Sequence, residues 1–265
     1  MSYDYLLTIA IILLCTKIFG LTSERVHMPQ VVGALIAGVL VGPSVLNWVG
    51  ETDFLVKAAE LGVIILMFNA GMDTDLEELK KTGFASFIIA MIGVIVPLIG
   101  GMIGYALYFG EDLSNYDQML QSLFVGVVLT ATSVSITVET LREMGRLSGK
   151  VGMTILGAAI IDDILGMVVL AVVSSMKDTS VKPTTVLIKI VLYFVLILIL
   201  FMVTSRLEFA IEKNDHKRRV AIFAIAFCFI LAYVSEIGFG IADITGAYFA
   251  GVMLCQSKIR DYVDV

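Results

Sequence analysis

Long apolar runs separated by short polar stretches extend along nearly the whole chain. Crossing the hydrocarbon core of a bilayer takes ~20 mostly apolar residues in a helix. Because runs of about that length recur, the pattern predicts an all-α, polytopic membrane protein with about nine spans. The predicted spans are 3–20, 29–49, 54–72, 84–109, 119–138, 151–174, 185–205, 219–235 and 239–255.

Hydroxyl side chains interrupt the fifth predicted span. Five of the eight residues from Thr130 to Thr137 are Ser or Thr. Such side chains compete for backbone hydrogen bonds and lower helix propensity, so we expect the helix to break into an extended crossing here. Freed carbonyls and hydroxyls suit a monovalent cation, and half-helix ends add favourable dipoles. The alternative for the run alone is an ordinary polar face between helices.

Two adjacent carboxylates, Asp162 and Asp163, lie at the middle of the sixth predicted span. An ionised side chain at the bilayer centre costs at least ~2.5 kcal/mol, so the pair requires a functional explanation. Successive helix positions differ by ~100°, so the two carboxylates face different neighbours. A carboxylate that holds either a proton or a cation, but not both, would couple the flux of protons to the flux of cations. The structural alternative is an ion pair between helices, although no Lys or Arg lies near mid-membrane to complete it.

Composition agrees with a membrane protein and excludes some partners. Hydrophobic residues make up 58% of the 265 residues and charged residues only 16%, against roughly 25% charge in soluble domains. No basic tract suggests nucleic acid. With the N-terminus outside, the outer face receives only Lys57, Lys177, Lys182 and Lys189 of the 18 Lys and Arg residues. The positive-inside rule therefore predicts a cell-membrane protein with an outer N-terminus and residue 265 in the cytoplasm.

An internal repeat links the second and the last predicted spans. Residues 33–40 (GALIAGVL) and 246–253 (GAYFAGVM) carry the same small residues at the same spacing. In the predicted topology these spans run in opposite directions, which is typical of the inverted repeats of secondary transporters. If each copy of the repeat has six helices and the seventh span links the copies, two complete copies end at a thirteenth helix. We therefore expect this chain to stop about four helices short of a complete second copy.

Glu139 lies at the cytoplasmic exit of the fifth predicted span, three residues before Arg142. One interpretation is a solvated surface pair. The other is a funnel that attracts cations towards the site. The sequence leaves both open.

Several motifs together resemble the bacterial monovalent cation:proton antiporters. They are Pro29, Gly33, Gly38, Gly42-Pro43-Ser44, the run 130–137, the stretch 157–166 (GAAIIDDILG) and the stretch 246–251 (GAYFAG). The resemblance implies an inverted-repeat fold with crossed broken helices, elevator-like alternating access and a homodimer. It implies that Asp163 binds Na⁺ or the proton, that Asp162 supports it, and that Thr130, Thr132 and Ser133 line the crossing. Transported Na⁺ or Li⁺ and H⁺ are the only ions implied, with no resident cofactor.

The resemblance also suggests a division of the chain. We expect scaffold or dimerisation helices in 1–75, the transport core in 76–176, a linker helix and cytoplasmic loop in 177–218, and the start of the second repeat in 219–265. The family places a second broken helix, and in electrogenic members a membrane Lys, in four further helices. The chain is then either a piece of a longer protein or completed by a partner.

Three alternatives accompany the sodium/proton reading. Kef-type potassium relatives usually lack one of the paired acids, so the intact pair favours sodium over potassium exchange. A shortened, non-transporting subunit that regulates a full-length partner fits the expected missing helices. An intramembrane aspartyl hydrolase would need two carboxylates around one water. Adjacent acids that diverge by ~100° are poorly placed for that, so we expect a transporter and not an enzyme.

Overall fold

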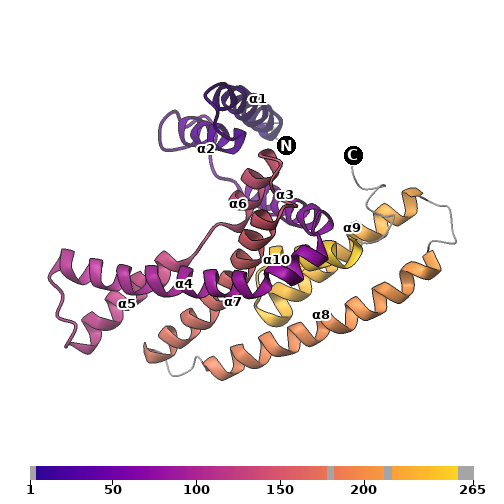
Figure 1. Ribbon diagram of the computed structural model, residues 1–265. Helices are drawn as coiled ribbons and strands as arrows, with labels where there is room; N and C mark the ends of the chain where they lie inside the picture. The colour runs from indigo at the N-terminus through magenta and orange to yellow at the C-terminus, as the bar shows by residue number, and fades with distance from the viewer. Residues whose placement is uncertain (1–3, 178–181, 212–216, 256–265) are drawn as a thin grey trace. The chain divides into compact units, whose positions relative to one another are not determined.

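The computed structural model describes residues 4–177, 182–211 and 217–255, and within these ranges every regular element is a helix (Figure 1). The ten α-helices and one π-helix, η1, are α1 (Asp4–Arg25), α2 (Gln30–Val41), α3 (Asp53–Met72), α4 (Leu76–Phe109), α5 (Tyr116–Thr130), α6 (Val134–Glu143), α7 (Lys150–Lys177), α8 (Pro183–Ile211), α9 (Lys217–Tyr233), η1 (Val234–Phe239) and α10 (Asp243–Leu254).

The predicted spans correspond to these helices. Seven segments of the described chain are long and apolar enough to cross a membrane, and the α5–α6 segment counts as one of them. The predicted spans 29–49 and 239–255 contain the shorter apolar helices α2 and α10, of 12 residues each. Helix α4 begins at Leu76, earlier than the predicted 84, because Asp75 caps its N-terminus ahead of the apolar stretch.

Contacts between residues divide the chain into two compact units. Unit 1 comprises residues 1–63 and 135–146, and unit 2 comprises 64–134 and 147–265. The predicted transport core, 76–176, therefore belongs to unit 2 except for residues 135–146. In unit 1, α1 and α2 lie side by side (Figure 1).

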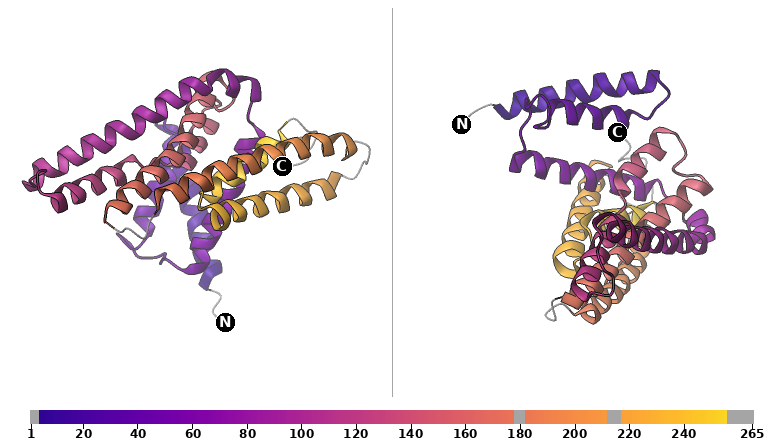
Figure 2. Two further views of the ribbon diagram at one scale, coloured as in Figure 1. Left: turned by 90° about the horizontal axis from the view of Figure 1, so that it is seen from below. Right: turned by 90° about the vertical axis from the view of Figure 1, so that its left-hand side faces the viewer.

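Helix α4 is the central element of the first part of unit 2. It packs along both α5 and α7, as Figures 1 and 2 show. The Ser86 hydroxyl donates a 3.0 Å hydrogen bond to the carbonyl of Thr154, which ties α4 to α7. Helices α8, α9, η1 and α10 pack on one another in the second part of the unit. The acid-bearing helix α7 is thus fixed against α4.

Helices α2 and α10, which carry the repeated motif, have similar local structure. Each has 12 residues, and the motif glycine is the fourth. A Cβ on Gly33 would lie 2.2 Å from the carbonyl oxygen of Phe19 on α1, and one on Gly246 would lie 2.6 Å from that of Leu231 on α9. Both glycines therefore allow a helix to pack against the backbone of the preceding helix. This likeness supports the repeat, while its orientation in the membrane stays a prediction.

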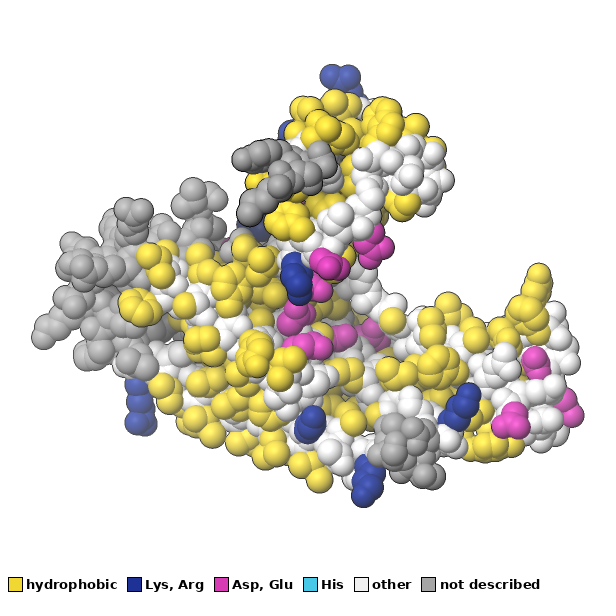
Figure 3. Space-filling view, turned by 180° about the vertical axis from the view of Figure 1, so that it is seen from behind, with side chains coloured by type: hydrophobic (Ala, Val, Ile, Leu, Met, Phe, Trp, Pro, Cys, Tyr) yellow, Lys and Arg dark blue, Asp and Glu magenta, His cyan; other side chains and the backbone are white. Residues whose placement is uncertain are grey.

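Apolar side chains cover much of the surface in Figure 3. On α4, for example, Phe84 and Leu107 are 78% and 80% exposed. Large contiguous apolar surfaces are rare on soluble monomers. This surface suits contact with acyl chains.

Candidate ion-binding site

The helix break predicted within 130–137 is present, and it is short. Helix α5 ends at Thr130 and α6 begins at Val134, so three residues interrupt the segment. Ala131 has an extended backbone, with φ −66° and ψ 118°. The Thr130 hydroxyl donates to the carbonyl of Val127 at 2.8 Å, one of the local bonds through which Thr competes with helix continuation. Ser135 and Thr137 are helical, so the break occupies only the beginning of the hydroxyl run.

Asp162 and Asp163 lie at the centre of the 28-residue helix α7. Asp162 is buried, with 7% of its surface exposed, whereas Asp163 is partly buried. The two side chains face different neighbours, as their adjacent positions predict. Within the described ranges neither forms an ion pair with Lys, Arg or His. The alternative of a structural ion pair therefore has no support in this part of the chain.

Asp162 faces the helix break. Its carboxylate has the side chain of Thr132 as a hydrogen-bonding partner. Its Oδ1 atom is buried and has no hydrogen-bond partner among the described residues. A Cβ built on Gly93 of α4 would lie 3.6 Å from this oxygen. The Asp162 carboxylate is thus enclosed between the break and α4, and one of its oxygens can still accept a hydrogen bond or coordinate a cation.

Asp163 faces α10. The Thr245 hydroxyl donates a 3.2 Å hydrogen bond to Asp163 Oδ2. The charges that act on Asp163 are those of Asp162 and of Glu236 in η1, both acidic. The sequence alone does not connect Thr245 with Asp163, because the two residues are 82 positions apart. The place of Thr245 beside the repeated glycine motif was the one signal that could have drawn attention to it.

The structure brings some of the predicted site residues together. Thr132 lies with Asp162, and the hydroxyl of Thr130 lies 4.0 Å from a Cβ built on Gly166 of α7. Thr130 is buried and Ser133 is exposed. The hydroxyl that the structure brings to Asp163 comes from α10 and not from the break.

Glu139 belongs to a different part of the molecule. In unit 1 it lines a cavity of about 500 Å³, together with Lys17, Gln30 and Glu143 among others. Glu143 accepts a 2.5 Å hydrogen bond from the backbone N–H of Gln30, the first residue of α2. The cavity has charges of both signs, and the role of Glu139 as a cation funnel stays a prediction.

Comparison with known families identifies the chain. Residues 9–263 match the family described as "Sodium/hydrogen exchanger, transmembrane". The chain belongs to this exchanger family. It is accordingly a multi-pass membrane protein, and the predicted resemblance to cation:proton antiporters is confirmed.

Exchangers of several organisms resemble the chain along nearly its full length. The Na⁺/H⁺-K⁺ antiporter GerN of Bacillus cereus is 37% identical over 266 residues, which cover 100% of this chain and 67% of GerN. The Na⁺/H⁺ antiporter of Enterococcus hirae is 33% identical, covering 98% of this chain and 67% of the relative. The chain thus spans about two thirds of the length of these exchangers.

A solved structure shares the fold. The sodium proton antiporter MjNhaP1 of Methanocaldococcus jannaschii matches with a TM-score of 0.64 at 18% identity, covering 98% of this chain and 66% of that one. The predicted fold class, an all-α sodium/proton antiporter fold, is therefore confirmed.

Proposed function

We propose that this chain carries the ion site of a sodium (or lithium)/proton exchanger, in which cation and proton compete for the aspartate pair, chiefly at Asp163. The observation that carries the proposal is the placement of two carboxylates at the centre of a membrane-length helix, beside a helix break and without a basic partner in the described chain. Leaving a carboxylate there without a ligand is costly, so it favours binding either a proton or a cation.

The two aspartates have separate roles in this proposal. Asp163 is the less buried residue of the two, and the proposal assigns it the exchange of the ions. Asp162, held by Thr132 of the break, supports it through its charge. Because both ions neutralise the same carboxylate, each displaces the other, and alternating access on the two sides of the membrane converts this competition into exchange.

The arrangement of the whole transporter is also part of the proposal. Helices within 76–176 form the moving core, 1–75 provide scaffold helices, and 219–265 begin the second repeat. The N-terminus is outside the cell membrane and residue 265 is cytoplasmic. Two copies form a homodimer in the lipid bilayer. A protein longer than this chain would complete the second repeat, because the matched exchangers are longer.

Potassium exchange is the second candidate, because the printed name of GerN, a 37% identical relative, includes potassium. Hydroxyl, carbonyl and carboxylate oxygens bind sodium, lithium and potassium alike. Measuring exchange with each of these three cations therefore decides between the two candidate functions.

The test is exchange by the protein in proteoliposomes with an imposed pH gradient and a pH-sensitive dye inside. We expect added sodium or lithium to drive proton movement, and Asp163→Asn to abolish it because Asn cannot exchange a proton for a cation. Asp117→Asn, in the exposed first turn of α5, is the matched control and should exchange normally. Exchange that survives in Asp163→Asn overturns the site assignment, and exchange with potassium alone overturns the sodium assignment.

A further inference from the structure

We infer that Thr245 is a positioning residue for Asp163, whose hydroxyl orients this carboxylate and biases it towards the cation and against the proton. The inference rests on the proposed function. The observation behind it is the 3.2 Å hydrogen bond from the Thr245 hydroxyl to Asp163 Oδ2, which links α10 to the centre of α7.

The position of Thr245 is fixed by the packing around it. Its side chain is buried, with 3% exposed, in the first turn of α10. The next residue, Gly246, packs against the carbonyl of Leu231 and the hydroxyl of Ser235, where a Cβ would lie 2.6 Å and 2.2 Å away. A Thr side chain also has few χ1 rotamers, because it is branched at Cβ. The hydroxyl is therefore held at Asp163 by a rigid helix start.

The groups around Asp163 give Thr245 particular weight. Asp162 on α7 and Glu236 in η1 are the charged groups that act on Asp163 in the described chain, and both are acidic. Thr245 is the hydrogen-bond donor that the structure provides to the Asp163 carboxylate in the described chain. A donor to a carboxylate stabilises the ionised form, which is the form that a cation binds.

A hydroxyl can also adapt to both states of Asp163, the ionised carboxylate that binds a cation and the neutral carboxyl that carries a proton. It donates a hydrogen bond to the ionised carboxylate, accepts a hydrogen bond from the neutral carboxyl, and can turn a lone pair towards a cation. Valine has a similar shape and can do none of these. The hydroxyl therefore affects the balance between the two ions, while the rest of the side chain contributes packing.

The experiment measures sodium-driven exchange in proteoliposomes at several sodium concentrations and pH values. Thr245→Val should raise the apparent KM for sodium about tenfold at fixed pH, the size expected when a hydrogen bond to a charged group is lost. The pH profile should move to higher pH, because the proton then competes better. Thr245→Ser keeps the hydroxyl and should stay within about twofold of the unmodified protein.

Thr74→Val is the matched control for packing. Thr74 is also buried, and its hydroxyl lies 3.1 Å from the hydroxyl of Tyr248, which is three residues after Thr245 on the same helix α10. It should lower thermal stability without moving the KM or the pH profile. If Thr245→Val behaves like this control, its role is structural and the inference is wrong.

A second pair of variants covers the case in which Thr245→Val does not fold. Thr245→Ala and Thr245→Ser differ by one oxygen atom, and the inference requires the KM difference to appear between them; equal KM values overturn it. Failure of the proposed function looks different, because exchange would then be absent from the unmodified protein or persist in Asp163→Asn. Loss of exchange in Asp163→Asn with normal kinetics in all Thr245 variants contradicts only this inference.

Discussion

Neighbouring aspartates in one helix acquire different surroundings because of helix geometry. The rotation of ~100° between successive residues directs Asp162 to the break and Asp163 to α10. Asp162 is enclosed and keeps one oxygen without a partner, whereas Asp163 is more exposed and receives a hydroxyl. Under the proposed function, this difference assigns the exchange of ions to Asp163 and a supporting charge to Asp162.

Gly93→Ala tests whether the unpartnered oxygen of Asp162 takes part in transport. The added methyl group would lie 3.6 Å from Asp162 Oδ1, an ordinary contact distance, so the helix should fold normally. The methyl would shield that oxygen from water and from an ion. We expect the apparent affinity for sodium to fall about threefold to tenfold, the range of one modest hydrogen bond, as measured by sodium-driven exchange.

Gly100→Ala on the same helix is the control, because nothing lies within 4 Å of a Cβ at that position. Both variants should have similar thermal stability in detergent. Normal sodium affinity in Gly93→Ala would show that neither water nor an ion needs to reach Asp162 Oδ1 during the transport cycle.

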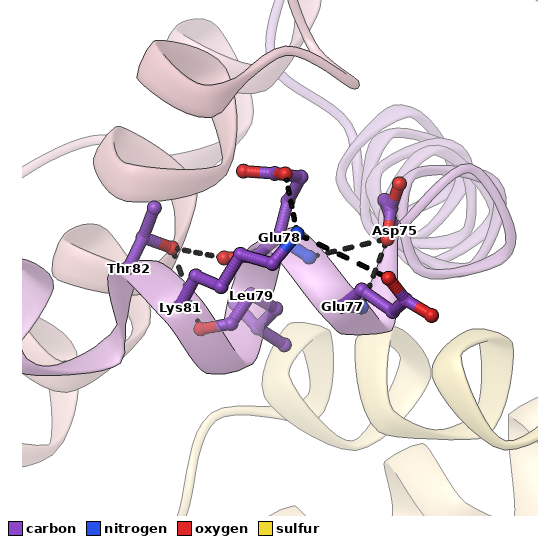
Figure 4. A network of polar contacts seen from close by, with 6 residues as sticks. All are labelled: Asp75, Glu77, Glu78, Leu79, Lys81 and Thr82. Carbon is purple, nitrogen blue, oxygen red and sulfur yellow. Dashed lines mark hydrogen bonds and ion pairs between the residues drawn. The ribbon is translucent and has the colours of Figure 1, made fainter.

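Among the elements, α4 is the helix that α5 and α7 pack on, and its N-terminus is defined by a local polar network (Figure 4). The Asp75 carboxylate accepts hydrogen bonds from the backbone N–H groups of Glu77 at 2.8 Å and Glu78 at 3.2 Å. Lys81 contacts Glu78 at 3.1 Å and Glu77 at 3.9 Å. The cap orders the first turn of the helix that supports the aspartate pair.

Asp75→Ala should destabilise this helix start by ~1 kcal/mol, the usual cost of losing a side-chain cap. For a protein of this size the midpoint of thermal unfolding should fall by about 2–4 °C. The measurement is a thermal unfolding curve in detergent. Asp75→Asn retains an accepting oxygen and should recover most of the loss.

Glu77→Ala provides the contrast at the same helix start. It removes a 3.9 Å contact between side chains that are 62% and 87% exposed, and pairs as exposed as this contribute little to stability, so the unfolding midpoint should not change measurably. A larger effect from Glu77→Ala than from Asp75→Ala would show that charge pairing, and not capping, stabilises the start of α4.

Local signals predicted the elements well and the site in part. Span lengths and the hydroxyl run identified the helices and the break at Ala131, because both depend on residues close in sequence. The mutual divergence of Asp162 and Asp163 followed from helix periodicity. The pairing of Thr245 with Asp163 could not be predicted, since it depends on the tertiary placement of the first turn of α10 near the middle of α7.

At the scale of the whole molecule, the distribution of positive charge bears on function, because it decides which side of the membrane each loop faces. Only four of the 18 Lys and Arg residues fall on the proposed outer side. Lys and Arg in short loops resist translocation, which is the physical basis of the orientation. The same orientation would place the α4–α5 loop outside and the α6–α7 loop inside.

Single-cysteine labelling tests this orientation. The three cysteines of the sequence, Cys15, Cys228 and Cys255, are first replaced by alanine. Ser114→Cys and Ser148→Cys then introduce one thiol each at exposed loop positions, after α4 and after α6 respectively. With an impermeant maleimide, intact cells should label Ser114→Cys, and Ser148→Cys should react only after permeabilisation, because the bilayer blocks the reagent. The reverse pattern would invert the proposed topology and exchange the two sides from which sodium and protons reach Asp163.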